Sequence, residues 1–177
     1  MTMKKNIIFI LLVFLSSDMF CQNIIQNKFW GYFFGMNKEI VKSGFNRDNI
    51  YFTEDQNSLT LYDQNFAGYL WKFVDMQFYN EKFYSIDFSS YYKRKADALE
   101  YYNFFKDKLD KKYNTVYQYE ENEDNMKKKV FFDECNSCFI ILKHSESDSG
   151  EMHWYFALSY WNNSLNDERI NSNNDEL

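Results

Sequence analysis

The sequence contains no proline and only five glycines among its 177 residues. No stretch rich in proline, glycine and serine interrupts it, so nothing marks a linker between two domains. It also lacks a glycine-rich phosphate loop, a serine-nucleophile elbow and an HExxH zinc motif. These absences favour one domain that carries none of the familiar catalytic motifs.

Positive charge is in short supply as well. Lys and Arg total 20 against 26 Asp and Glu, which gives a formal net charge of −6. A protein that binds nucleic acid needs a basic surface to displace counterions, so we expect no nucleic-acid partner. Aromatic residues are abundant instead, at 21% of the chain, which is far above the level of a disordered chain.

One long apolar run is present, and it lies at the N-terminus. Lys4 and Lys5 precede the apolar residues 7–15, and a short polar piece follows, which is the order of a secretory signal peptide. The run makes a helix of about 14 Å, too short to span a bilayer. We therefore expect residues 1–21 to be removed on export, leaving a secreted or periplasmic protein without a transmembrane span. Alternatively, Cys21 is lipidated and the protein is associated with the outer membrane.

Two later segments have the periodicity of amphipathic helices. The first begins after Asn37, a good N-cap, and is expected to end before Gly44, a residue that often follows a helix. The second covers residues 94–113. Its apolar residues recur at helical spacing: Ala98, Tyr102, Phe105 and Leu109.

Elsewhere polar and apolar residues alternate, which predicts β-strands. The candidate strands lie near residues 50–53, 59–62, 69–78, 84–89, 115–119, 129–133, 139–144 and 153–161. The element order is therefore α-β-β-β(β)-α-β-β-β-β, an α+β fold with two helices packed on antiparallel β-meanders. We expect a single domain over residues 22–161 and a polar, frayed tail over residues 162–177.

A short motif precedes the first helix. From Trp30 to Val41 the sequence reads W-G-x-x-F-G-M-x-x-x-I-V. It resembles the opening of small exported bacterial proteins of the BamE/beta-lactamase-inhibitor-protein-like type, in which an aromatic-glycine turn precedes a short helix and a meander. The resemblance extends in pattern over residues 28–90, and the element order of residues 94–161 fits a second copy. Because members of this group bind other proteins and are not enzymes, the resemblance implies a binding role.

Three aromatic residues on one strand are candidate binding residues. Tyr69, Trp71 and Phe73 alternate with Leu70 and its apolar neighbours, so we expect them on the opposite face of the strand. Either a second core layer covers them, or they form an exposed aromatic patch that marks a partner- or sugar-binding surface.

The pair Cys135-Asn-Ser-Cys138 lies between two strand-like runs. Asn136 and Ser137 would then form the tip of a hairpin, with the cysteines as its flanking pair. In an exported protein this arrangement predicts a disulfide between Cys135 and Cys138. Metal-bound or unpaired thiols and a redox-active pair are the alternatives.

His144 and His153 flank an acidic loop and are the only histidines. Across a hairpin their rings could meet and form a metal or acid–base site, or both could be ordinary loop-edge residues. We therefore expect an exported, non-enzymatic module that binds a protein or another envelope macromolecule and needs no cofactor. The alternative is a small hydrolase or metal-dependent enzyme that uses His144 and His153.

Overall fold

A computed structural model of the chain describes residues 25–133, 138–146 and 154–174. The expected signal peptide, including Cys21, lies outside the described residues, and so do Cys135 and His153. The described strands are β1 Lys28–Phe29, β2 Tyr32–Phe33, β3 Phe52–Asp55, β4 Ser58–Phe66, β5 Tyr69–Tyr79, β6 Lys82–Tyr92, β7 Tyr117–Glu123, β8 Met126–Asp133, β9 Cys138–Glu146 and β10 Trp154–Asn162. The described helices are α2 Lys38–Arg47, α3 Lys95–Lys112 and α4 Asn163–Asn174.

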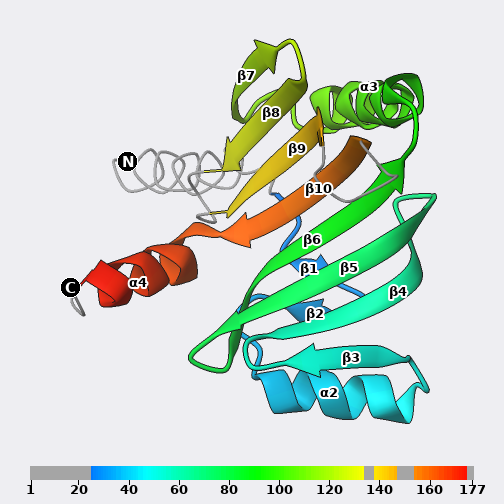
Figure 1. Ribbon diagram of the computed structural model, residues 1–177. Helices are drawn as coiled ribbons and strands as arrows, with labels where there is room; N and C mark the ends of the chain where they lie inside the picture. Colours follow the sequence, from blue (N-terminus) through cyan, green and yellow to red (C-terminus); the bar gives the residue numbers. More distant parts are fainter. Residues whose placement is uncertain (1–24, 134–137, 147–153, 175–177) are drawn as a thin grey trace, which may run out of the picture.

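Eight strands form one antiparallel sheet with the order β3-β4-β5-β6-β10-β9-β8-β7. It consists of two four-stranded meanders, β3–β6 and β7–β10, which join where β6 pairs with β10 (Figure 1). Each meander follows a helix, α2 or α3. The expected α+β class with an antiparallel sheet is therefore confirmed. The expected element order matches only roughly, because the short β1–β2 hairpin and α4 are additional.

The helix α3 covers one face of the sheet and contacts β6, β9 and β10. The four residues expected at helical spacing are its buried residues, so this helix and its buried face are confirmed. They pack with aromatic and aliphatic side chains of the sheet, including Trp71, Phe88 and Phe156, in one continuous core. Phe29 of β1 enters the same core, so the β1–β2 hairpin also lies on this face.

The helix α2 begins where expected, because the Asn37 side chain accepts a hydrogen bond from the Glu39 N–H at 2.9 Å. The expected end before Gly44 is wrong, since the helix continues to Arg47. Gly44 serves a different purpose. A Cβ atom at this position would lie 2.1 Å from the hydroxyl oxygen of Tyr32, so glycine is needed for the close approach of that ring.

The strand β5 changes the face it buries partway along its length. Val74 is buried as expected, but Leu70 is 45% exposed and Trp71 is fully buried. The pairing is irregular here: the register of β4 and β5 omits an Asp63–Lys72 pair, Asp63 has a positive φ of 51°, and the Lys72 N–H donates to the Ser90 hydroxyl at 3.2 Å. Beside this irregularity Trp71, and not Leu70 as expected, joins the core.

Residues 163–174, which were expected to be part of a frayed tail, form α4. The Asn162 side chain accepts a hydrogen bond from the Leu165 N–H at 2.9 Å and caps the first turn. The helix packs on the sheet through Tyr79, whose hydroxyl donates to the Ser172 hydroxyl at 2.7 Å. Because the helix is held by polar contacts, its sequence has no periodic apolar residues from which it could be predicted. Across the described residues, the helices are all too short or too polar to cross a membrane.

Candidate binding groove on the outer sheet face

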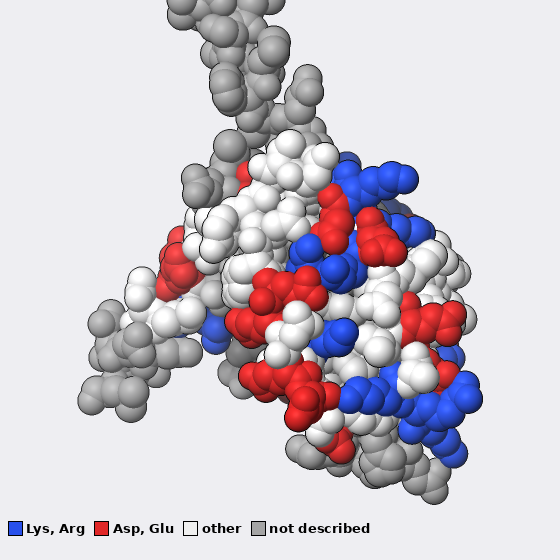
Figure 2. Space-filling view, turned by 90° about the horizontal axis from the view of Figure 1, so that it is seen from above, with Lys and Arg blue, Asp and Glu red and all other residues white. Residues whose placement is uncertain are grey.

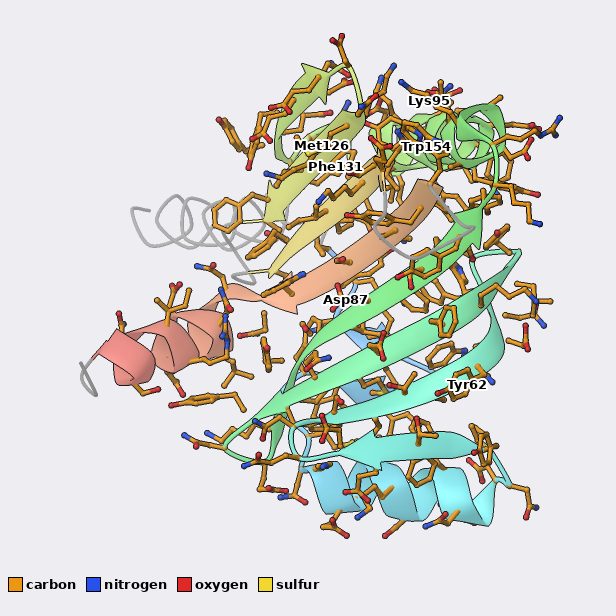
Figure 3. All side chains as sticks on the ribbon, viewed as in Figure 1. Tyr62, Asp87, Lys95, Met126, Phe131 and Trp154 are labelled. Carbon is orange, nitrogen blue, oxygen red and sulfur yellow. The ribbon has the colours of Figure 1, made fainter. Side chains whose placement is uncertain are left out.

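We call the sheet face opposite α3 the outer face. A groove of about 660 Å³ lies on it over β4, β5 and β6, and we call it the outer groove. Its lining residues are Thr60, Tyr62, Asp63, Lys72, Phe73, Asp75, Ser89 and Tyr91. Figure 3 labels Tyr62 on β4 and Asp87 on β6, with β5 between them. Side chains from three neighbouring strands of a rigid sheet therefore shape the groove.

Aromatic side chains form one wall of the outer groove. Tyr62 and Phe73 are cross-strand partners with ring centroids 5.8 Å apart. Phe73 lies 5.7 Å from Tyr91, which lies 6.1 Å from Tyr155 on β10. We call these four residues the aromatic row. The row crosses four strands; Tyr62 and Phe73 are 37% and 36% exposed and present apolar surface to solvent, whereas Tyr91 and Tyr155 are half-buried.

Two carboxylates lie beside the aromatic row. Asp75 of β5 is directly opposite Asp87 of β6, and we call them the acid pair. Such partners have Cβ atoms about 5 Å apart, close enough for their charges to repel. The Thr60 hydroxyl donates a hydrogen bond to Asp75 at 2.5 Å, and the Ser159 hydroxyl bonds to Asp87. Within the described part of the chain, neither carboxylate has an ion-pair partner.

Asp87 has an unusual titration behaviour for an aspartate. Burial raises its pKa to about 6; the hydrogen bond from Ser159 opposes this shift, and the negative charge of Asp75 adds to it. Near neutral pH the ionised acid pair is therefore an unfavourable arrangement of two like charges. Chemically, it can be relieved by a proton or by a positively charged group of a ligand.

The rim of the outer groove carries a pair of opposite charges. The Lys72 ammonium lies 2.7 Å from the Asp63 carboxylate, and both side chains are more than half exposed. This exposed pair neutralises itself and contributes little stability. The net negative charge of the lining residues therefore comes from Asp75, whose cross-strand partner is Asp87.

The expected binding residues Tyr69, Trp71 and Phe73 do not share a face. Trp71 is fully buried and stacks on Phe156 with ring centroids 4.9 Å apart. Tyr69 is half-buried beside Trp71, at 4.9 Å, on the same side of the sheet. Phe73 alone reaches the outer groove. The expected trio is thus divided between the core and the outer face.

Cys138 lies on the core face, and its cross-strand partner is Asp133. The two strands pair as a hairpin, and its expected tip at Asn136 and Ser137 lies outside the described residues. No disulfide is present among the described residues, and Cys135 lies outside them. Burial raises the pKa of the Cys138 thiol to about 11, with the charge of Asp133 adding to it, which is the opposite of what a reactive thiolate needs.

His144 lies in the core beneath α3 and is only 1% exposed. Its ring stacks on Trp154 with centroids 5.3 Å apart and meets Tyr102 of α3 at 6.3 Å. Neither ring nitrogen has a hydrogen-bond partner at normal geometry among the described residues. His144 is therefore a buried core residue. The described residues contain no cluster of three or more potential metal ligands.

The end of the molecule around α3 and β7 is charged in a different way from the outer groove. In the view of Figure 2, acidic and basic side chains lie next to one another. Several are paired: Lys128 lies 3.1 Å from Glu121, and Lys106 lies 3.5 Å from Glu120. Charge at this end is locally balanced, in contrast to the acid pair.

Sequence reasoning missed the acid pair because its register is irregular. A two-residue turn at Asn80 and Glu81 would place Asp75 opposite Ile86. A bulge between Gln77 and Phe78 shifts the ladder by one residue, so that Asp75 faces Asp87.

No family model, curated protein or solved structure matches this chain. The candidate site is therefore defined by its geometry alone.

Proposed function

We propose that the protein is an exported, non-enzymatic binding module that holds a segment of another protein in the outer groove. The observation that carries this proposal is the aromatic row, which crosses four strands beside the acid pair and exposes the rings of Tyr62 and Phe73. Exposed aromatic rings supply large contact area at a low cost in conformational entropy, which suits them to a protein interface. The expected resemblance to the BamE/beta-lactamase-inhibitor-protein-like group, whose members bind other proteins, supports the same role.

Export belongs to the same proposal and is supported by the signal-peptide pattern of residues 1–21. We propose a secreted or periplasmic location, or association with the outer membrane if Cys21 is lipidated. The alternative enzymatic role of His144 and His153 gains no support from His144, because its buried ring is not accessible to a substrate.

Selection of random peptides on the immobilised mature protein tests the proposal. Peptides that bind wild type should lose binding to the variant Phe73→Ser. They should keep binding to Tyr117→Ser, a control that removes a ring 65% exposed on the distant strand β7. Peptides that bind wild type and Phe73→Ser equally, or failure to select any peptide, would contradict the proposal.

A further inference from the structure

We propose that the outer groove recognises a lysine or arginine side chain, with the charged head at the acid pair and the aliphatic stem against the aromatic row. This inference rests on the proposed function and specifies the chemistry of the segment bound.

The first argument is the charge of the acid pair. Asp75 and Asp87 face each other without an ion-pair partner from the described residues, and the charge of Asp75 disfavours the ionised form of Asp87. A cation placed between them would interact with both carboxylates. Their two hydroxyl partners, Thr60 and Ser159, use only part of the hydrogen-bonding capacity of the carboxylate oxygens, and the remainder can accept N–H donors.

The second argument is the shape of the surface beside that charge. Phe73 and Asp75 are two residues apart on the same face of β5, a separation of about 7 Å. Tyr62 and Thr60 repeat this arrangement on β4, so apolar and polar positions form parallel rows across the strands. Lysine and arginine have the matching structure, an apolar stem that ends in a cation.

The third argument comes from the protein itself. The Lys143 ammonium lies 5.5 Å from the ring centre of Tyr155, at the far end of the aromatic row. A basic side chain of the chain thus already lies over a ring of this row. The chain's formal charge of −6 would also favour the approach of a cationic segment.

An organic cation fits better than a metal ion. The acid pair offers two carboxylates, and the described residues place no third His, Cys, Asp or Glu side chain with them. Calcium takes six to eight oxygen ligands. The aromatic row provides no metal ligand, whereas it does provide the apolar wall that an alkyl stem requires.

The test is a titration followed by two-dimensional nitrogen–proton NMR at pH 7.5. The probes are N-acetyl-lysinamide, N-acetyl-argininamide and the neutral N-acetyl-norleucinamide. We expect one or both cationic probes to shift amide signals of β5 and β6 at millimolar concentration, and the neutral probe to leave them unchanged. The comparison of the two cationic probes shows whether lysine or arginine is preferred.

The matched variants are Asp75→Asn/Asp87→Asn and the control Glu121→Gln/Glu123→Gln, which removes two acidic charges from β7. We expect cation affinity to fall at least tenfold in the first and to stay within twofold in the second. Equal shifts from the neutral and cationic probes, no shifts from any probe, or unchanged binding by the asparagine variant would overturn the inference. If the asparagine variant does not fold, the comparison of lysinamide with norleucinamide on wild type tests the inference by itself.

These outcomes separate the two proposals. If the selected peptides depend on Phe73 but show no preference for basic residues, the protein-binding function would be supported and the recognition of a lysine or arginine side chain would be contradicted. If lysinamide binds but no Phe73-dependent peptide can be selected, the cation site would be supported and the protein-binding function would be contradicted.

Discussion

Asp75 and Asp87 stand directly opposite each other on β5 and β6, on the face of the sheet that α3 leaves uncovered. Like charges in this position destabilise a sheet. Burial and the charge of Asp75 raise the pKa of Asp87 to about 6, although the hydrogen bond from Ser159 acts in the opposite direction. The raised pKa shows that the ionised form of Asp87 is destabilised in the folded protein. A feature that lowers stability and lies beside exposed aromatic rings is characteristic of a binding site.

The first prediction is that Asp87→Asn stabilises the protein at neutral pH. The folded-state pKa of Asp87 is above its ordinary value of 3.8, so the native state binds this proton more tightly than the unfolded state. Wild type should therefore gain stability as the pH falls from about 6 towards about 4. At pH 7 the variant should be more stable by roughly 2–3 kcal/mol, since each pKa unit corresponds to about 1.4 kcal/mol.

Urea unfolding of both proteins between pH 4 and pH 8 measures this difference. The gain from Asp87→Asn should shrink as the pH falls, because the protonated aspartate is also neutral. A variant that is less stable than wild type at pH 7 would show that the acid pair is not under electrostatic stress.

The second prediction concerns His144 and has the opposite dependence on pH. Burial lowers its pKa, and the charges of Lys95 and Lys127 act in the same direction, while interaction with the Lys95 backbone opposes part of the shift. The unfolded state therefore binds the proton more tightly, so stability should fall as the pH drops through about 6.5, the ordinary histidine value.

The variant His144→Phe keeps the stacking on Trp154 and removes the titrating group. Its unfolding free energy should lack this loss at acidic pH, which a series of urea titrations on both proteins measures. Parallel pH profiles for wild type and variant would contradict the assignment of His144 as a neutral core residue.

A third prediction tests the change of face along β5. Trp71→Ala should destabilise the protein by about 3–5 kcal/mol, because it removes a fully buried ring that packs on Phe156 and Phe105. Phe73→Ala, two residues away on the outer face, should cost about 1 kcal/mol. Chemical denaturation of the two variants compares them directly, and equal losses would mean that both rings occupy similar environments.

The fourth prediction is that Gly44→Ala destabilises the protein although alanine is the better helix former. The new methyl group would meet the Tyr32 hydroxyl, so we expect a loss of about 1–3 kcal/mol. In a Tyr32→Ala background the same substitution should instead stabilise by about 1 kcal/mol, the usual preference of a helix for alanine over glycine. A double-mutant cycle by thermal or urea unfolding tests this reversal of sign, and the same effect in both backgrounds would refute the close approach.

The sequence was sufficient to predict the elements that follow a regular period. The four apolar residues of α3 recur at helical spacing and are buried, and the antiparallel meanders follow from alternation. The outer groove depends on two irregularities of the strands, and neither can be predicted from the alternation of polar and apolar residues. Trp71 and Val74 are both buried although they lie three residues apart, beside an irregular position at Asp63 and Lys72. The bulge between Gln77 and Phe78 brings Asp75 opposite Asp87.

The same limit explains α4 and Gly44. A polar helix held by the Asn162 cap and by Tyr79 has no apolar stripe to reveal it. Gly44 was interpreted as a helix end because glycine is common there, whereas its role depends on Tyr32, twelve residues earlier in the chain. Both cases depend on contacts between side chains that only the folded chain brings together.

The most direct test of the central claim measures stability and cation binding together, in wild type and in Asp87→Asn at pH 7.5. We predict that the variant unfolds at higher urea concentration and binds N-acetyl-lysinamide or N-acetyl-argininamide more weakly than wild type does. A variant that gains no stability and binds these probes as well as wild type would contradict the account, because the two opposed carboxylates would then neither strain the sheet nor hold a ligand.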